Sequence, residues 1–271
     1  MYVDSHCHLS DPALLDRLPQ IRRSMAQARV DRALCICTTL EEFPTVHGVA
    51  TGHDEIWCTV GVHPDNEGVA EPTLADLVER AALPRVVGIG ETGLDYYRLA
   101  GRSLEDMAWQ RERFRVHIRA ARATALPLVV HTRSASADTL AVLADEGQGA
   151  VRGVFHCFTE TMAVAEAALA LGFHISFSGI LTFRNATALR EVARLVPLER
   201  CLIETDSPYL APMPHRGKPN EPAYVAHVAA QLAAIKGLPV DEIARVTSAN
   251  FERLFAIPAL PPSPEDDEKL L

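Results

Sequence analysis

The sequence begins with Tyr2-Val3-Asp4-Ser5-His6-Cys7-His8, which has the pattern of a short β-strand that ends in a His-x-His pair. Side chains two residues apart on a strand share a face, so His6 and His8 are predicted to point inward and Cys7 outward. Similar apolar or β-branched runs recur along the chain, at residues 33–38, 56–62, 86–91, 128–131, 153–156, 174–178 and 201–206. The sequence therefore predicts eight short strands.

Longer amphipathic runs lie between these strands and predict helices, at residues 73–82, 103–124, 135–146, 162–171, 186–195 and 222–236. The helix at 103–124 begins with a capping-box pattern, because Ser103 is followed three residues later by Asp106. Eight strands separated by helices within about 250 residues predict an α/β fold, a single (β/α)8 TIM barrel. An open doubly wound sheet uses the same units, and the pattern alone does not exclude it.

The composition is that of a folded, globular protein. Of the 271 residues, 48% are hydrophobic and 23% are charged, which excludes a largely disordered chain. We expect one barrel domain over residues 1–257, followed by an exposed, acidic and proline-rich tail at 258–271. The net charge of −9 excludes a protein that coats nucleic acid through overall basicity.

Two further features bear on where the protein works. No run of about eighteen apolar residues is present, so no membrane span is predicted, and the first residues lack a signal-peptide pattern. The six cysteines stand singly in apolar segments, which indicates reduced thiols rather than disulfides. We therefore expect a cytoplasmic protein that makes no membrane contact and acts as a monomer.

Six side chains suited to metal binding stand where the predicted strands end. In a TIM barrel the carboxyl ends of all strands meet at one rim, where the active sites of this fold lie. The rim would collect four imidazoles and two carboxylates, from His6, His8, Glu91, His131, His156 and Asp206. Such a set suits Zn²⁺, Mn²⁺ or similar divalent ions. Each residue alone could instead be a hydrogen-bonded core histidine or a carboxylate paired with arginine, but their coincidence at one rim favours a metal site.

The remaining histidines are weaker candidates. His63, in Gly61-Val62-His63-Pro64, either contacts substrate or orders its loop, and the sequence leaves both open. Five others are interpreted as structural residues without partners, namely His47, His53, His117, His174 and His227.

One motif suggests a dinucleotide-binding site instead of a metal site. Gly88-Ile89-Gly90-Glu91-Thr92-Gly93 matches the G-x-G-x-x-G fingerprint of dinucleotide sites and follows a predicted strand. That fingerprint requires a helix to begin at once, so that the pyrophosphate meets the positive helix end. No helical pattern follows here, and Glu91 would repel the phosphates. We therefore expect no nucleotide cofactor.

Six motifs occur in order along the chain: His6-Cys7-His8, Gly61-Val62-His63-Pro64, Gly90-Glu91-Thr92-Gly93-Leu94-Asp95-Tyr96, Phe155-His156-Cys157-Phe158, Glu204-Thr205-Asp206-Ser207-Pro208-Tyr209 and Pro214-His215-Arg216-Gly217-Lys218-Pro219-Asn220-Glu221-Pro222. Together they resemble the TatD family of metal-dependent deoxyribonucleases, over residues 2–255. Thr92 stands where isoleucine is commoner in that family, a departure that affects no ligand.

The resemblance implies an amidohydrolase-like barrel with two divalent metal ions, which would be Mg²⁺, Mn²⁺ or Zn²⁺. It implies that one metal is held by His6, His8, Glu91 and Asp206. Glu91 would bridge to a second metal held by His131 and His156. Asp206 is also placed to orient or deprotonate the attacking water, so Asp206 and Glu91 are the predicted catalytic residues.

DNA is the substrate that this resemblance implies. Two metals about 3.5–4 Å apart stabilise the attacking and leaving oxygens of a phosphoryl transfer and make a bound water acidic. Candidate substrate contacts around the rim are His63, Arg133, Glu204, Arg216 and Lys218, of which Glu204 is also a candidate ligand for a further ion. A deep rim accommodates a strand end better than an intact duplex. We therefore expect an exonuclease that hydrolyses phosphodiester bonds in single-stranded or frayed DNA, and the resemblance to the TatD family implies that it acts in the 3′–5′ direction.

Two other functions stay open at this point. The same metal barrel hosts hydrolysis of a small ester, amide or phosphotriester, and a metal-binding scaffold without catalysis is the second alternative. No serine or cysteine nucleophile with a paired base is evident. By strand alternation, Cys7 and Cys157 are expected to point away from the cavity.

Overall fold

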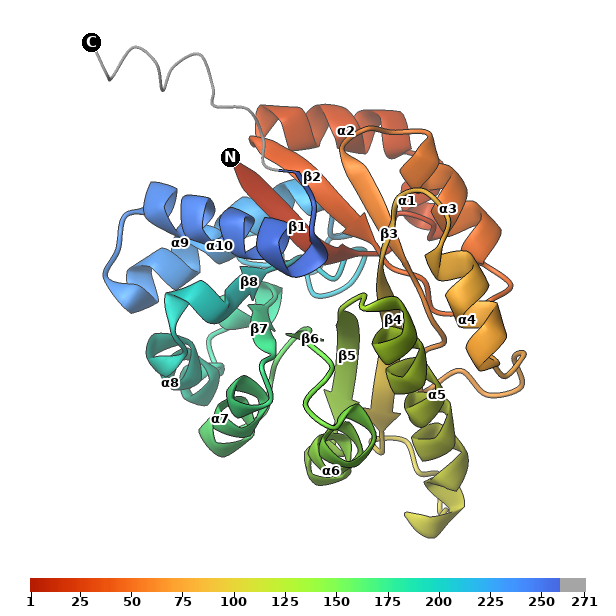
Figure 1. Ribbon diagram of the computed structural model, residues 1–271. Coiled ribbons are helices and arrows are strands. Elements are labelled where there is room, and N and C mark those ends of the chain that lie inside the picture. The colour runs from red at the N-terminus through yellow and green to blue at the C-terminus, as the bar shows by residue number, and fades with distance from the viewer. Residues whose placement is uncertain (259–271) are drawn as a thin grey trace.

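The computed structural model describes residues 1–258, in which eight strands and the surrounding helices form a (β/α)8 barrel (Figure 1). The strands are β1 (Tyr2–Cys7), β2 (Val30–Cys35), β3 (Ile56–Val60), β4 (Val86–Asp95), β5 (Leu128–Arg133), β6 (Gly153–Phe155), β7 (His174–Phe177) and β8 (Cys201–Ile203). Each strand pairs in parallel with the next in the chain, in the order β1 to β8. The predicted TIM barrel is confirmed, and the doubly wound alternative is wrong because its strand order would reverse.

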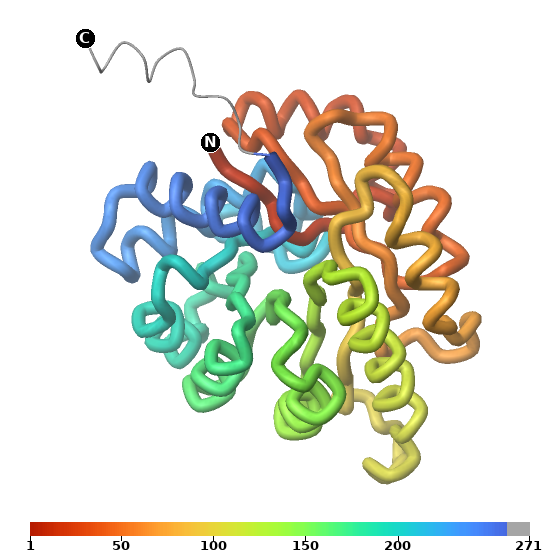
Figure 2. Tube along the Cα trace, in the orientation of Figure 1, coloured from red at the N-terminus to blue at the C-terminus, as the bar shows by residue number. Residues whose placement is uncertain are grey.

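The barrel closes between β1 and the segment that follows β8. The backbone N–H of Asp206 donates to the carbonyl of His6 at 2.9 Å, and that of His8 donates to the carbonyl of Ser207 at 2.9 Å. Cys7 and Ser207 also form a parallel bridge. β1 and the segment that follows β8 therefore lie side by side at the carboxyl rim, and Figure 2 traces the chain between them.

Helices cover the outside of the barrel in Figure 1. They are α1 (Pro12–Leu15), α2 (Leu18–Gln27), α3 (Phe43–Thr51), α4 (Leu74–Ala81), α5 (Ala108–Thr124), α6 (Ser136–Gly147), α7 (Met162–Ala170), α8 (Thr187–Leu195), α9 (Val225–Lys236) and α10 (Val240–Phe255), with short 3-10 turns η1 (Glu105–Met107), η2 (Gly179–Thr182), η3 (Leu198–Arg200) and η4 (Pro222–Tyr224). The six predicted helices are present. The capping box is present as well, because Asp106 accepts from the Ser103 backbone N–H at 2.8 Å and donates its own N–H to the Ser103 hydroxyl at 3.3 Å.

The last helix, α10, closes the amino end of the barrel. Its Phe251 and Phe255 are fully or almost fully buried and form a cluster with side chains from the beginnings of several strands, among them Val3 and Val129. Burial of aromatic side chains is among the strongest stabilising contributions in a core. With that end filled, the carboxyl rim is the open end of the barrel.

Two strands run further than expected, and this shapes the rim. β4 continues past Glu91 to Asp95, and β5 continues past His131 to Arg133. The segment that matches the dinucleotide fingerprint is therefore part of a strand, so the exclusion of that site agrees with the structure. Gly93, at φ +137°, lies against β5, where an added Cβ would stand 1.9 Å from the His131 carbonyl oxygen. Only glycine permits β4 and β5 to approach so closely beside the cavity.

The cysteines and the helices also bear on the expectations of reduced thiols and of no membrane span. All six cysteines are free thiols, five of them buried. Among residues 1–258 no single helix is long and apolar enough to cross a membrane. Only the stretches 222–236 and 240–255 taken together pass that test, and they are bent by 111°. Most of the predicted tail lies outside the described residues.

Candidate metal centre

A cavity of about 740 Å³ opens at the carboxyl rim of the barrel. Five of the six predicted ligands line it directly, namely His8, Glu91, His131, His156 and Asp206. The sixth, His6, is fully buried beside them. Parallel strands bring these side chains together because each one stands at or just beyond the carboxyl half of its strand.

Glu91 lies at the centre of this group. Its Oε1 atom is 2.8 Å from Nε2 of His156, 3.1 Å from Nδ1 of His131 and 3.3 Å from Nε2 of His63. Its other oxygen, Oε2, is 3.4 Å from Nε2 of His6. One carboxylate therefore faces four imidazoles, and it is 3% exposed. His63, which the sequence left between two roles, contacts the same carboxylate as the predicted ligands.

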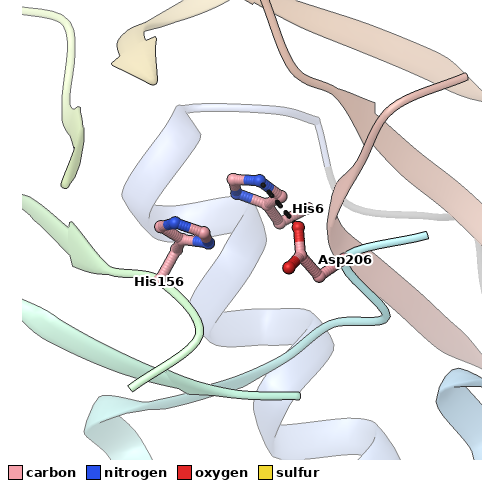
Figure 3. A group of neighbouring side chains, drawn as sticks. All are labelled: His6, His156 and Asp206. Carbon is pink, nitrogen blue, oxygen red and sulfur yellow. Dashed lines mark ion pairs between the residues drawn. The ribbon is translucent and has the colours of Figure 1, made fainter. Parts of the chain in front are cut away.

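Asp206 forms the second part of the group, on the side of β1. Its Oδ1 atom lies 3.3 Å from Nε2 of His8 and 3.5 Å from Nε2 of His6. Figure 3 shows Asp206 and His156 on two sides of the His6 ring, and the rings of His6 and His156 stack at 3.9 Å between centroids. His6 thus connects the Asp206 part of the group to the Glu91 part.

The donor set fits a divalent metal. Within residues 1–258, three sets of ligand atoms lie within 4.8 Å of one another, namely His6–His156–Asp206, His6–His8–Glu91 and His63–Glu91–His131. Both ring nitrogens of His6 are buried without a hydrogen-bond partner. A buried polar atom without a partner costs free energy, and a metal ligand bond removes that cost. These groups could therefore bind metal.

The electrostatics of the centre keep both carboxylates ionised. Burial alone would raise the pKa of Glu91, but His156, His63 and His131 together hold it well below its ordinary value. For Asp206, burial is likewise outweighed, by the hydrogen bond from His8 and the nearby His6, so its pKa is lowered. Two ionised carboxylates in a mostly buried pocket attract positive charge.

A supporting carboxylate was missed by sequence reasoning. Asp95, at the end of β4, contacts Nε2 of His131 through Oδ2. Its backbone N–H donates to the side-chain oxygen of Gln110 on α5 at 2.9 Å, and the Gln110 amide donates to its carbonyl at 3.1 Å. The signal was available in the sequence, since Asp95 follows Glu91 at an even spacing along one strand.

Two expectations are corrected by the structure. Glu204 is fully buried and accepts from the Cys157 N–H at 2.8 Å, with its Oε1 atom 3.3 Å from Nδ1 of His156, so it faces no substrate. Cys157 lines the cavity instead of pointing away from it, with its sulfur 3.1 Å from the Ser178 hydroxyl. Strand alternation does not apply to Cys157 because β6 ends at Phe155 and the Cys157 φ is +42°.

Two side chains of α5 hold the loop that carries His63. Arg113 donates to the carbonyl of His63 at 2.7 Å, and Nε2 of His117 accepts the Val62 N–H at 2.9 Å. The His117 ring also contacts the Arg113 carbonyl through Nδ1, at 2.8 Å. The expectation that the remaining histidines have no partner is therefore wrong for His117, although its role is structural. It is also wrong for His47, whose Nε2 lies 3.0 Å from the Pro84 carbonyl oxygen, and for His227, whose Nε2 lies 3.1 Å from Nε2 of His215.

The predicted cationic contacts lie in two different places. Arg133 lines the cavity and stacks over the ring of Tyr97, 3.6 Å from the ring centroid. Arg216 and Lys218 are exposed and do not line the cavity, and Arg216 stacks on Phe183. A further cation, Arg98, lines the cavity, and its side chain is 72% exposed.

The family model described as TatD related DNase matches residues 3–256 of the sequence. The chain belongs to this family. It is 47% identical over 261 residues to the uncharacterized metal-dependent hydrolase YcfH of Escherichia coli K12, covering 95% of this chain and 96% of YcfH. It is 37% identical over 239 residues to the 3′–5′ ssDNA/RNA exonuclease TatD of Citrobacter rodentium, covering 85% and 88%.

The fold of this TatD-family chain agrees with a solved structure. The TatD homologue YjjV of Escherichia coli K12 matches it with a TM-score of 0.87 at 27% identity, covering 95% of this chain and 98% of YjjV. The chain is thus a metal-dependent hydrolase with the barrel of the TatD family. The predictions of family, fold and enzyme class are confirmed.

Proposed function

We propose that this TatD-family hydrolase is a divalent-metal-dependent deoxyribonuclease that removes nucleotides from the 3′ end of single-stranded or frayed DNA. The observation that carries the proposal is the single carboxylate of Glu91 facing four imidazoles at the base of a cavity that arginines border. The relative named a 3′–5′ ssDNA/RNA exonuclease, at 37% identity, supports this polarity and strand preference.

Two metal ions are part of the proposal. One would be held by His6, His8, Glu91 and Asp206, and the second by Glu91, His131 and His156, with Glu91 shared between them. The fit rests on the orphaned nitrogens of His6 and on the close approach of the other donors. Bound Mg²⁺, Mn²⁺ or Zn²⁺ would neutralise charge on the scissile phosphate and make a water acidic. A set rich in imidazole favours Zn²⁺ or Mn²⁺ over Mg²⁺.

Asp206 is the proton acceptor in this proposal. Its side chain is 15% exposed and lines the cavity, so a water in the cavity can reach it. The hydrogen bond from His8 and the nearby His6 lower its pKa, so the carboxylate carries no proton near neutral pH. Glu204, bonded to the Cys157 N–H and close to His156, is a positioning residue that fixes the His156 ring from beneath.

The substrate class follows from the surroundings of the cavity. Arg98 and Arg133 border it and would contact phosphates of the chain on either side of the scissile bond. Their local charge matters more for binding than the overall charge of −9. A cavity of about 740 Å³ has the size of a pocket for a small ligand or a strand end, and a duplex does not fit within it.

One chain supplies every group of the centre, so we also propose that the enzyme acts as a monomer. The six free thiols support a reducing compartment such as the cytoplasm. The alternative function is hydrolysis of a small ester, amide or phosphotriester by the same barrel.

One experiment separates these functions. The protein is stripped of metal, dialysed and supplied with Mg²⁺, Mn²⁺ or Zn²⁺, and then given an oligonucleotide labelled at its 5′ or its 3′ end. A 3′–5′ exonuclease produces a descending ladder from the 5′ label and an early labelled mononucleotide from the 3′ label. A Glu91→Gln preparation excludes a contaminating nuclease. Turnover of small esters, amides or phosphotriesters with an intact oligonucleotide would favour the alternative.

A further inference from the structure

Tyr209 borders the cavity with an exposed aromatic ring. The residue is 57% exposed and belongs to the loop that follows Asp206. Within the described residues its hydroxyl has no hydrogen-bond partner. Tyr96, directly after β4, is 6% exposed and donates its hydroxyl to Asp138 at 2.7 Å, so it has an evident structural role. Tyr209 has neither the burial nor the hydroxyl hydrogen bond of Tyr96, so the same structural role does not explain it.

The backbone of Tyr209 is held by hydrogen bonds although most of its side chain is exposed. Its N–H donates to the carbonyl of Asp206 at 2.9 Å, and its carbonyl accepts from Nδ2 of Asn220 at 2.6 Å. Asn220 is fully buried and also donates to the carbonyl of Thr205 at 2.8 Å. An exposed ring on a rigid backbone loses little conformational entropy when a ligand packs against it.

The ring also stands at a set position relative to the metal centre. Its centroid lies 6.0 Å from that of the His8 ring, and the two planes meet at 68°. The same loop carries Asp206 three residues earlier, bound to Tyr209 through the backbone. A planar group that stacks on Tyr209 would therefore lie beside the position where the scissile phosphate has to sit.

We propose that Tyr209 forms a nucleobase-stacking subsite, which packs against one face of an unpaired base in one of the two terminal nucleotides. This inference rests on the proposed nuclease function and adds a reason for its strand preference. A base inside a duplex has both faces covered by its neighbours, whereas a base at a single-stranded or frayed end has a free face. Stacking tolerates every base, because each has a π-face, so the subsite predicts little sequence preference.

The test is a cycle that removes the ring and the base separately. The substrates are an end-labelled oligonucleotide and two copies that carry an abasic residue at the terminal or the penultimate position. In the parent enzyme, the abasic residue at one of these positions should lower kcat/KM by about 5- to 150-fold, the range found when a stacking ring is removed. Tyr209→Ala should cost a similar factor with the intact oligonucleotide and should reduce the abasic penalty to less than about twofold.

Two further variants complete the cycle. Tyr209→Phe keeps the ring and should keep the full abasic penalty. Leu195→Ala changes an equally exposed apolar residue on α8, 62% exposed and outside the cavity, and should also keep it. An abasic penalty of equal size in the parent and in Tyr209→Ala would overturn the subsite.

The design also distinguishes failure of the subsite from failure of the nuclease function. A parent enzyme that digests intact and abasic oligonucleotides at the same rate retains the nuclease function and has no stacking subsite. A parent enzyme that cleaves bis(p-nitrophenyl) phosphate, a diester without a base, but no oligonucleotide lacks the proposed function, and the subsite is then overturned with it.

Discussion

The carboxylate of Asp95 lies 3.0 Å from Nε2 of His131, while the other nitrogen of that ring, Nδ1, lies 3.1 Å from Glu91. Both nitrogens of one imidazole thus face a carboxylate, and the ring is held from two sides. Carboxylates that contact the free nitrogen of a metal-binding histidine orient the ring and increase its basicity. Asp95 is therefore a positioning residue for His131.

Asp95→Asn should weaken metal binding at the Glu91–His131 side by about 10- to 100-fold, because the amide supports the ring less well. Metal titration followed by calorimetry measures this directly, and the melting temperature checks the fold. Asp145→Asn, which changes an exposed carboxylate on α6, is the control and should bind metal like the parent. Equal metal affinity in the Asp95 variant would show that the contact does not matter for the metal.

Removal of metal should abolish hydrolysis. The centre has a buried histidine, His6, whose ring nitrogens have no hydrogen-bond partner, and two ionised carboxylates, an arrangement that requires a cation to act on a phosphate. Turnover of the labelled oligonucleotide should vanish after chelation and dialysis and return with Mg²⁺, Mn²⁺ or Zn²⁺. Undiminished turnover by protein that elemental analysis shows to be free of metal would disprove the metal mechanism.

Asp206→Asn should lower turnover by about 10²–10⁴-fold, the usual contribution of a general base, and a weakened metal ligand would add to the loss. The change keeps the shape of the side chain but removes its charge and basicity. The melting temperature should change little, since the carboxylate is partly open to the cavity rather than packed in the core.

Glu91→Gln provides the comparison for Asp206→Asn. Loss of the shared carboxylate should lower the content of both metals, whereas Asp206→Asn should affect one metal and the proton transfer. Elemental analysis and turnover, measured on the same preparations, separate these outcomes. If Asp206→Asn binds two metals and turns over at the parental rate, Asp206 is not the proton acceptor.

The cavity arginines should contribute more to DNA binding than the cations outside it. Replacing Arg98 and Arg133 together with alanine should weaken binding of single-stranded DNA and flatten its dependence on salt, because fewer counterions are released. Alanine at Arg216 and Lys218 removes the same charge away from the cavity and should have the smaller effect. Fluorescence anisotropy across a salt series measures both slopes. A larger effect from Arg216 and Lys218 would move the proposed path of the DNA to the loop after β8.

His117 should make stability depend on pH. Burial lowers its pKa from 6.5 to about 4 in the folded protein, so the unfolded chain binds the proton more tightly. The contribution of neutral His117 to the free energy of unfolding is fully present above pH 6.5 and is lost as the pH falls toward 4. A shift of this size corresponds to about 3 kcal/mol in the free energy of unfolding.

His117→Gln is the matched variant, because its side-chain oxygen can still accept the Val62 N–H but does not titrate. The free energy of unfolding of the metal-free parent and of the metal-free variant is measured with denaturant at each pH. Between pH 6.5 and 4 that of the parent should fall relative to that of the variant. A difference that stays constant with pH would show that His117 titrates normally.

The strands were predictable because each is a compact apolar run, and the helices less so. α10 went unpredicted: the expected barrel needs no further helix, and Phe251 and Phe255 pack into the end of the barrel rather than along its side. α1 is a single turn of four residues, too short to show a period. α2 and α3 each have a proline near their first residue, and a proline there is equally typical of a turn.

The metal-ligand candidates could be grouped from sequence because strand ends converge, whatever the details of the loops. The burial of each side chain and the conformation of the loops could not be predicted from the positions of the strand ends. Glu204 has the alternation of an inward residue, yet it lies beneath His156 with no exposed surface. Asp95 was overlooked because β4 was expected to end at Glu91, four residues early.

The hydrogen bond from Asp206 to the carbonyl of His6 has a consequence for synthesis of the protein. Because synthesis proceeds from the N-terminus, His6 and His8 are made about 200 residues before Asp206. These two histidines therefore lack their carboxylate partner until Asp206 has been added. No nascent chain that stops short of the loop after β8 can hold the complete centre. Contacts between such distant residues also form late and slowly in folding. The hydrolytic centre is therefore complete only after synthesis has passed Asp206 and the barrel has closed between β1 and the loop after β8.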